Sequence, residues 1–344
     1  LQLLCVLPGR LDLLPFLGKI HKASRRDQDK GAAQGHEESF VGRYVARRLA
    51  KEGWRVRVAV RRPNEAVFVR PYGVVGQVEP VFCNIRDDAS VAQVMTGADA
   101  VVNCVGTFDA RGKNSFDAVQ HEGAARIARI AAEQGVAHMV HISALGADRD
   151  SESAYARTKA LGEDAVMAAF PGAVILRPSI IFGPEDEFFN RFAAMARLGP
   201  LLPVVGAKTR FQPVYVDDVA RAAVMGVLGQ AKPGIYELGG PDVHTFRELM
   251  VEMLGVIRRQ RLVVNIPFWA AGILARLMEL GQTLTFGLVS AQITRDQVAN
   301  LRRDNVVSDG ARGFKELGIA PTSMEAVLPD YLWRFRPSGQ YDAI

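Results

Sequence analysis

A serine, a tyrosine and a lysine in this sequence have the spacing of a hydride-transfer site. Ser143 ends the apolar run HMVHIS, and Tyr155 and Lys159 follow it in the segment YARTK. Residues four apart lie on one face of a helix, so the lysine ammonium can lower the pKa of the phenol and hold a ribose hydroxyl. The serine hydroxyl can bind a substrate carbonyl. A tyrosine and a lysine at this spacing are also common on solvated helix faces, but their place after a buried strand favours a catalytic site.

Short apolar runs alternate with helical patterns around these residues, which predicts a parallel sheet. Predicted strands cover residues 56–60, 78–82, 100–106, 138–143 and 173–179, and predicted helices cover residues 41–51, 89–95, 116–134 and 154–169. Gly53 has the position of a left-handed cap at the end of the first helix. The predicted fold class is therefore α/β, a Rossmann-like doubly wound parallel sheet with a smaller, mostly helical C-terminal lobe.

This pattern predicts three parts of the chain. After residue 182 the regular alternation of strands and helices gives way to helices and loops with a few isolated strands. The predicted parts are an atypical leader or linker at residues 1–39, an NADP-binding Rossmann domain at 40–182 with 211–240, and a C-terminal lobe at 183–210 with 241–344.

The first 39 residues do not have the pattern that opens such a fold. Residues 1–20 are apolar but interrupted by prolines and charges, so they suit neither a secretory signal nor a membrane span. We expect them to be unstructured or loosely packed, and residues 21–38 to be a polar linker. No buried strand with a glycine turn precedes Phe40, so either another segment replaces the first strand or that strand is missing. A displaced reading frame or a wrongly assigned start would explain both this leader and Leu1 in place of an initiator methionine.

The composition is that of a soluble globular protein, with 49% hydrophobic and 23% charged residues among 344. The net charge of +5 comes from arginines spread along the chain, which argues against nucleic acid as a partner and suits an anionic cofactor or anionic lipid. Cys5, Cys83 and Cys104 are far apart and lack ligand spacing, so we expect no metal site and a reducing compartment.

Four longer motifs follow one another in an order and spacing that resemble the extended or atypical short-chain dehydrogenase/reductases. They are YARTK at 155–159, LRPSIIFGP at 176–184, VYVDDVARA at 214–222 and YELGGPDVHTFRELM at 236–250. Within that family, further segments are similar to the dehydrogenase-like accessory subunits of respiratory complex I and their bacterial relatives. These segments are FVGRYVARRLA at 40–50, VRPYGVVGQVEPV at 69–81, FPGAVILRPSIIFGPEDEFFNRF at 170–192 and a late apolar helix.

The resemblance implies an accessory, non-core subunit of NADH:ubiquinone oxidoreductase that holds NADP(H) structurally, without independent turnover, and has other complex I subunits as partners. It also implies a peripheral position on the inner membrane, on the cytoplasmic side in bacteria or the matrix side in mitochondria. The alternative is an active NADP-dependent oxidoreductase or epimerase, in which Tyr155 is the acid/base, Lys159 tunes it and Ser143 orients a carbonyl. Gln120 stands where extended members of the family usually place asparagine, which weakens the case for full catalytic geometry.

The glycine motif of the family is incomplete in this chain. Gly42 matches the third glycine of GxxGxxG, where a missing side chain lets helix and strand pack closely, while Ser39 and His36 stand at the other two positions. Serine can approximate a glycine there, but histidine followed by two glutamates cannot, because the backbone must approach a pyrophosphate. We therefore expect a cofactor site that includes Ser39, Phe40, Val41 and Gly42 but binds NADPH much more weakly than three glycines would.

The remaining cofactor residues are predicted from strand ends. Arg61 and Arg62 close the second strand, where a guanidinium suits a 2′-phosphate and favours NADP(H) over NAD, unless both are ordinary solvated arginines. The resemblance places three further sets of residues around the cofactor. They are Asn84 and Ile85 near the adenine, Val105 and Gly106 near the nicotinamide ribose, and Pro178 beside the nicotinamide pocket.

Residues 258–280 form the candidate membrane surface. Three arginines at 258, 259 and 261 precede an apolar helix that is interrupted by Arg276 and Glu279 and is too short to span a bilayer. Such a helix can lie in the membrane interface, with the arginines meeting anionic lipid. An ordinary core helix of the C-terminal lobe is the alternative.

Overall fold

The computed structural model describes residues 3–7, 40–107, 112, 114–284 and 294–341. It divides into two compact units. Unit 1 comprises residues 1–142, 165–174 and 223–234, and unit 2 comprises residues 143–164, 175–222 and 235–344.

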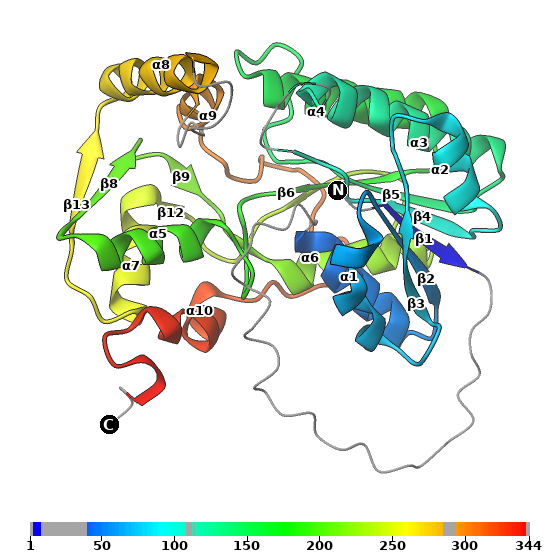
Figure 1. The fold of residues 1–344 in the computed structure, drawn as a ribbon, viewed down its shortest axis with the longest axis horizontal. Coiled ribbons are helices and arrows are strands. Elements are labelled where there is room, and N and C mark those ends of the chain that lie inside the picture. The colour runs from blue at the N-terminus through cyan, green and yellow to red at the C-terminus, as the bar shows by residue number, and fades with distance from the viewer. Residues whose placement is uncertain (1–2, 8–39, 108–111, 113, 285–293, 342–344) are drawn as a thin grey trace. The chain divides into compact units, whose positions relative to one another are not determined.

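A seven-stranded sheet runs through the part of the chain in which strands and helices alternate (Figure 1). Its hydrogen-bonded order is β11-β6-β5-β4-β1-β2-β3. The strands are β1 (Leu3–Leu7), β2 (Arg55–Val60), β3 (Val78–Phe82), β4 (Ala100–Asn103), β5 (His138–Ile142), β6 (Val174–Pro178) and β11 (Gly234–Leu238). β2 pairs in parallel with β3, and β4 pairs in parallel with β5. The predicted Rossmann-like sheet is confirmed.

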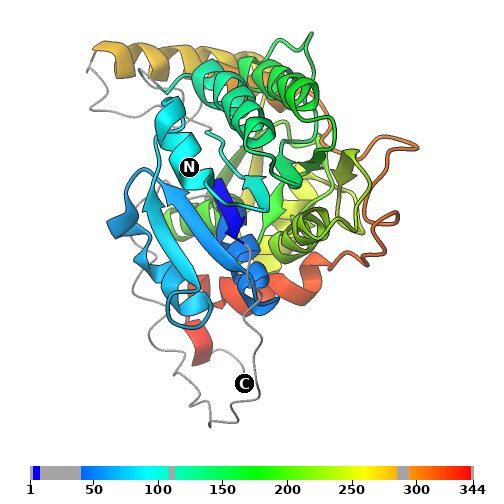
Figure 2. The same ribbon diagram turned by 90° about the vertical axis from the view of Figure 1, so that its right-hand side faces the viewer.

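Strand β1 occupies the place between β2 and β4 and runs antiparallel to both of them. Leu7 lies opposite Arg55 at the amino end of β2, whereas Leu3 lies opposite Ala59 and Asn103 near the carboxyl ends of β2 and β4. Cys5 is completely buried. The expectation of an unstructured or loosely packed opening is therefore wrong for residues 3–7. Of the two alternatives for the first strand, another segment replaces it, because an apolar run can form a ladder in either direction. Figure 2 shows this strand in dark blue.

The reversal of β1 changes how the chain reaches the first helix, α1 (Phe40–Lys51). In a doubly wound fold the first strand ends at the carboxyl edge of the sheet and turns at once into the helix. Here the chain leaves β1 at Leu7, level with the amino end of β2. Strand β1 and helix α1 therefore do not form the tight turn in which a dinucleotide pyrophosphate normally sits.

The helices of unit 1 follow the apolar periodicity of the sequence. α1 buries Val45 and Leu49, and the φ of +87° at Gly53 confirms the predicted left-handed cap. α2 (Asp88–Met95) is capped by Asp87, whose side chain accepts from the NH of Ser90. A π-helical turn (Asp117–His121) leads into α3 (Glu122–Glu133), so the long helix expected at 116–134 begins with a wider turn.

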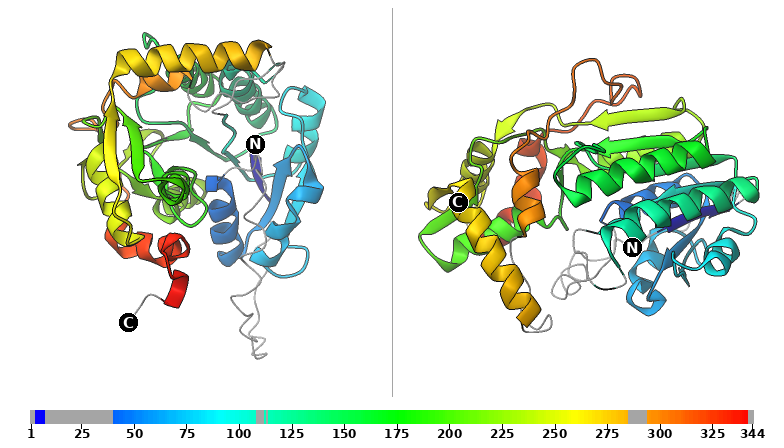
Figure 3. Two further views of the ribbon diagram at one scale, coloured as in Figure 1. Left: turned by 60° about the vertical axis from the view of Figure 1, so that its left-hand side comes forward. Right: turned by 90° about the horizontal axis from the view of Figure 1, so that it is seen from above.

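Unit 2 contains small sheets and most of the later helices. Its elements include the pairs β7 (Ile181–Phe182) with β10 (Val214–Tyr215), β8 (Leu201–Val205) with β13 (Leu262–Ile266) and β9 (Arg210–Phe211) with β12 (His244–Thr245). The helices are α4 (Ala154–Ala169), α5 (Phe188–Leu198), α6 (Val216–Val227), α7 (Phe246–Val256), α8 (Phe268–Leu284), α9 (Arg295–Asn300) and α10 (Met324–Leu332), of which α4 and α6 extend into unit 1. Figure 3 shows β13 in yellow leading into α8 in gold.

The core of unit 2 is rich in aromatic rings. Phe182, Phe189, Leu202 and Leu328 are completely buried in one cluster. Among the described residues, no helix is both long and apolar enough to cross a membrane, and no group of three histidine, cysteine or acidic side chains could hold a metal ion.

Candidate functional site

Three arginines gather at the carboxyl ends of β2 and β3 in unit 1. Arg61 and Arg62 follow β2, and Arg86 follows β3. Burial lowers the pKa of Arg61, the positive charges of Arg62 and Arg86 lower it further, and Glu65 opposes them. Glu65 also pairs with Arg62 at 3.2 Å, on an exposed part of the surface. The cluster can therefore bind an anion that relieves the repulsion between guanidinium groups.

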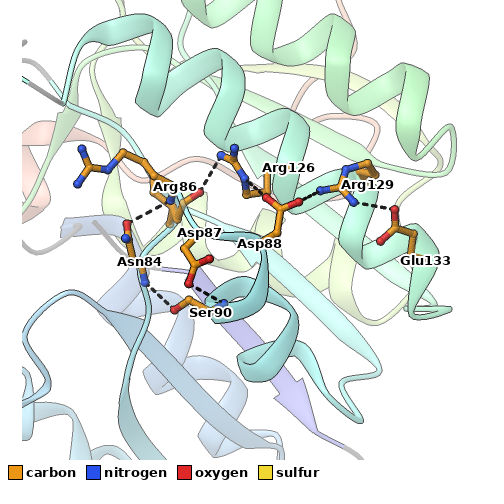
Figure 4. Close-up of polar contacts among 9 residues, drawn as sticks. Asn84, Arg86, Asp87, Asp88, Ser90, Arg126, Arg129 and Glu133 are labelled. Atoms are coloured by element: carbon orange, nitrogen blue, oxygen red, sulfur yellow. Dashed lines mark hydrogen bonds and ion pairs between the residues drawn. The ribbon is translucent and has the colours of Figure 1, made fainter.

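The loop after β3 is held in place by its own hydrogen bonds (Figure 4). The NH of Asn84 donates to Ser90 Oγ at 2.9 Å, and Asn84 Oδ1 accepts from the NH of Arg86 at 3.2 Å. Arg126 of α3 donates from Nη1 to the carbonyl of Ile85 at 3.0 Å. Ile85 is buried and Asn84 is half-buried. The two predicted adenine residues thus lie on a preorganised turn.

An ion-pair network beside this loop connects α2 with α3. Asp88 accepts from Arg126 Nε and Arg129 Nη2, each at 2.5 Å, and Arg129 also donates to Glu133 at 2.7 Å, as Figure 4 shows. The hydrogen bond from Arg126, with help from Arg129, holds the pKa of Asp88 below its usual value. These groups are largely exposed, so each pair contributes little stability by itself. Arg126 is a positioning residue because it bonds both Asp88 and the loop carbonyl.

The loop after β4 carries the next two predicted cofactor residues. Val105 is buried, and its NH donates to Asn103 Oδ1 at 3.0 Å, while Gly106 is exposed. Asn103 Nδ2 is in turn 3.0 Å from Nδ1 of the buried His141. Gln120, at the position where the family usually has asparagine, donates to the carbonyl of Thr107 at 2.8 Å. The loop is therefore supported from two sides.

The start of α1 presents the remaining unit 1 residues. Val41 and Gly42 are buried, and Phe40 is half-buried with its ring 5.7 Å from that of Tyr44. Ser39 and His36 lie outside the described residues. The cation cluster fits the phosphate of an adenosine moiety, but β1 and α1 do not supply the pyrophosphate turn that a dinucleotide normally uses.

Ser143 of unit 2 belongs to a buried ion-pair network. Its NH donates to the carbonyl of Leu176 at 2.7 Å, and its hydroxyl hydrogen bonds to Glu163. Glu163 is buried and receives three bonds from Arg177, from Nε at 2.9 and 3.1 Å and from Nη2 at 2.6 Å. Arg177 Nη1 also reaches Glu237 at 3.5 Å. An ionised carboxylate only accepts, so the single proton of the Ser143 hydroxyl points to Glu163.

Tyr155 and Lys159 lie on α4, at the end where a carboxylate caps the helix. Asp296 of α9 accepts from the NH of Ala154 at 2.6 Å and from Ser153 Oγ at 2.9 Å. Burial raises the pKa of Tyr155, and the charge of Asp296 raises it further. Lys159 is buried on the same helix. The net shift of the Tyr155 pKa is thus upward, opposite to the lowering that a Tyr–Lys pair suggests.

Pro178, the last predicted site residue, ends β6 and is buried, with its carbonyl accepting from the NH of Leu145 at 2.9 Å. Sequence reasoning missed the partners that define these sites. Arg86 had a signal, since it lies two residues beyond Asn84 at a neighbouring strand end. Glu163, Arg177 and Asp296 had none, because their contacts are set by the fold.

Comparisons with known proteins agree with this architecture. A model of the NAD dependent epimerase/dehydratase family matches residues 37–239. The crystal structure of a dTDP-glucose 4,6-dehydratase from Streptomyces venezuelae with NAD bound shares the fold, with a TM-score of 0.63 and 21% identity over 89% of this chain and 94% of that one.

Two curated proteins are similar over most of their length. The NADH dehydrogenase (ubiquinone) 1 alpha subcomplex subunit 9, mitochondrial, of Arabidopsis thaliana is 36% identical over 307 residues, 87% of this chain and 76% of that protein. The ceramide reductase of Caulobacter vibrioides is 34% identical over 231 residues, 66% of this chain and 71% of that protein. The resemblance found in the motifs is confirmed, and the chain belongs to the NAD dependent epimerase/dehydratase family.

Proposed function

We propose that this chain is an accessory subunit of respiratory NADH:ubiquinone oxidoreductase that holds NADP(H) as a structural element and does not turn it over. The likeness to the Arabidopsis subunit supports the assembly. The observation that best supports the absence of turnover is the hydrogen bond from the Ser143 hydroxyl to the buried Glu163.

Ser143 is committed to the protein interior rather than to a substrate. To polarise a substrate carbonyl, the Ser143 hydroxyl would have to break its hydrogen bond to Glu163 and donate to the substrate instead. The Glu163 carboxylate would then be bonded by Arg177 alone. Giving up a hydrogen bond to a buried charged group costs roughly 1.5–3 kcal/mol. The network therefore favours a serine that stabilises the fold over one that activates a substrate.

Tyr155 is kept protonated by its surroundings. A general acid/base works best when its pKa lies near the operating pH. Burial and the charge of Asp296 both move the Tyr155 pKa away from that range. In this proposal Tyr155 and Lys159 bind a ribose hydroxyl and transfer no proton.

The arginine cluster of unit 1 supports NADP(H) over NAD(H). A 2′-phosphate carries the negative charge that Arg61, Arg62 and Arg86 require, whereas an unmodified ribose diol would leave their repulsion in place. Because the pyrophosphate turn is not formed by β1 and α1, binding relies on the adenosine end of the cofactor. We therefore infer a weaker affinity for NADPH than in relatives with three glycines.

Helix α8 supports a position at the surface of the inner membrane. Its buried side is made of small residues, Ala271 and Ala275, while Trp269, Ile273 and Leu277 are more than half exposed. These three residues are four apart and form one stripe. A core helix would bury its large side chains and expose its small ones, so the arrangement favours an apolar surface outside the chain.

Arg259 and Arg261, which precede this helix, have no carboxylate partner among the described residues. Arg259 Nε donates to the carbonyl of Phe335 at 2.9 Å, and Arg261 Nε donates to the carbonyl of Ala196 at 2.8 Å. A bond to a neutral carbonyl fixes a guanidinium but leaves its charge available for lipid phosphate. The proposal places residues 258–280 against anionic lipid, on the matrix side in mitochondria or the cytoplasmic side in bacteria.

An active NADP-dependent oxidoreductase is the second candidate, favoured by the retained Tyr155 and Lys159 and by the likeness to a protein named ceramide reductase. A turnover screen separates the two. Purified chain is incubated with NADPH and a panel of carbonyl compounds, ceramide precursors and nucleotide sugars, with Tyr155→Phe as the matched variant. We expect equal, background oxidation of NADPH by both proteins. Turnover that Tyr155→Phe abolishes would overturn the proposal.

A further inference from the structure

The turn that joins η3 (Val67–Tyr72) to β3 exposes two valines that the cofactor and membrane sites do not use. Val75 is completely exposed, and Val74 is 47% exposed. Single apolar side chains are common on protein surfaces and need no explanation. These two valines differ because the turn that carries them is held in one conformation.

A buried glutamine holds the turn in one conformation. The NH of Gln77 donates to the carbonyl of Val74 at 3.0 Å, and the NH of Val74 donates to Gln77 Oε1 at 2.9 Å. From Nε2 the same side chain donates to the carbonyls of Ala50 at 2.7 Å and Trp54 at 3.0 Å. The turn is thereby tied to the end of α1. Because it is already ordered in the folded protein, binding a partner loses little conformational entropy at the turn.

Two glycines fit the same conformation. A Cβ at Gly73 would lie 2.2 Å from Oε1 of Gln77, and Gly76 has a φ of +77°, which other residues rarely adopt. The sequence GVVG is therefore matched to one backbone shape with the valines at its outer corner.

The segment before the turn is anchored to α1 by stacked cations. The guanidinium of Arg43 lies 4.8 Å from the ring centre of Phe68, and that of Arg47 lies 4.8 Å from the ring centre of Tyr72. Val69, which lies between Phe68 and Tyr72 in the sequence, is completely buried. The base of the turn is thus packed against α1.

The charges around the tip are mostly positive. Residues 40–80 contain nine lysines and arginines against three glutamates. Lys51, Arg55 and Arg70 are exposed and form no ion pair among the described residues. Lys51 and Arg55 each adjoin a residue whose carbonyl accepts from Gln77, so they flank the turn.

We propose that this turn docks into an apolar pocket on an acidic protein surface, namely another subunit of the respiratory complex; the inference rests on the proposed function. A rigid apolar tip surrounded by charges that can steer an acidic partner has the layout of an apolar interface core with a polar rim. Valine suits a protein pocket better than a membrane interface, where aromatic and larger aliphatic residues dominate.

Addition of a partner strand does not compete with this mode of docking. Strand β3 is at the edge of the sheet, but Pro80 lies in its middle and lacks the NH that a ladder would use. The contact is therefore made by side chains at the turn.

The test uses complex purified from membranes of a strain lacking this chain, to which the full-length chain is added. Affinity is measured by mass photometry for the wild type, Val74→Ser/Val75→Ser and Arg70→Glu. The matched control is Val243→Ser/Val251→Ser, which changes two exposed valines of unit 2. We expect the turn variant to bind at least about tenfold more weakly, Arg70→Glu about fivefold, and the control as the wild type does.

Thermal unfolding first establishes that all variants are folded. A wild type that binds while the turn variant binds equally well would overturn the docking inference and leave the proposed function intact. A wild type that does not bind would overturn the proposed function and the inference with it. Loss of binding to anionic phospholipid vesicles by the turn variant, with unchanged binding to the complex, would assign the turn to the membrane instead.

Discussion

The two units have kept different parts of a dinucleotide enzyme. Unit 1 retains a cation cluster at the ends of β2 and β3, but its central strand β1 runs in the opposite direction. Unit 2 retains Ser143, Tyr155 and Lys159, but hydrogen bonds commit the serine to Glu163, and a carboxylate sits at the start of α4. In the proposed function, unit 1 recognises a cofactor phosphate, and the Ser143 network of unit 2 has a structural role.

This difference shows that the presence of a sequence motif does not by itself determine the chemistry of the site. The Tyr–Lys pair is complete in the sequence, yet burial and the charge of Asp296 raise the pKa of Tyr155. The glycine motif is incomplete, yet the arginines beside it still suit a phosphate. Retained residues can therefore mark binding as well as catalysis.

The largest effect is expected from a charge placed in β1. Cys5→Asp would put a carboxylate at a completely buried position between two strands, which should lower the free energy of unfolding by about 3 kcal/mol or more. Urea unfolding measures the loss, with Cys83→Ser as a milder buried control. A stability equal to that of the wild type would show that residues 3–7 are not a strand of the sheet.

A slightly smaller loss is expected in the network of unit 2. Glu163→Gln removes the charge that Arg177 requires and should lower the free energy of unfolding by about 3 kcal/mol, less if solvent reaches the arginine. Glu133→Gln, in the exposed network of unit 1, should cost well under 1 kcal/mol. If Glu163→Gln were as stable as Glu133→Gln, the structural role of Ser143 and Glu163 would be wrong.

Cofactor preference should respond to the cluster of unit 1. Arg86→Glu replaces an attractive charge near the phosphate by a repulsive one, so affinity for NADPH should fall about tenfold while affinity for NADH changes little. Fluorescence titration with both nucleotides measures this, and Arg197→Glu in unit 2 is the control. An equal loss of affinity for NADPH and NADH would show that the arginine cluster does not bind the 2′-phosphate.

The smallest effect concerns the pH dependence of Tyr155. Its pKa is raised above the usual value of 10, so the folded state gains stability that is present below pH 10 and is lost as pH rises further. Asp296→Asn removes one cause of the shift, so tyrosine ionisation followed by ultraviolet absorbance should begin at lower pH. Asparagine keeps an oxygen that can accept from the NH of Ala154, so the cap of α4 should be largely retained. An unchanged titration curve would mean that the Asp296 charge does not reach Tyr155.

Much of the fold could be predicted from the sequence because local apolar periodicity and turn residues indicate most of the strands and helices. Apolar runs located the strands, and Gly53 marked the end of α1. Strand β1 was not predicted, because prolines and charges interrupt the apolar opening, and its direction could not be predicted either, since a short apolar run can pair in either direction. Arg61 and Arg62 could be found from their place after a strand. Glu163 and Asp296 could not, because they meet Ser143 and the start of α4 only through tertiary packing.

The same limit applies to α8. The sequence predicted an apolar helix and left two readings open, a membrane surface or a lobe core. Periodicity does not say which face turns inward, and burial of Ala271 and Ala275 with Trp269 exposed is a property of the fold.

Native-membrane purification tests the central claim most directly. The chain carries an affinity tag, the complex is separated on a native gel after mild detergent extraction, and the tagged band is examined for NADH:ubiquinone oxidoreductase activity and bound nucleotide. We predict that the chain migrates with the active complex and that any bound nucleotide is NADP(H). A tagged chain found only as a free protein, separate from the complex, would contradict the account.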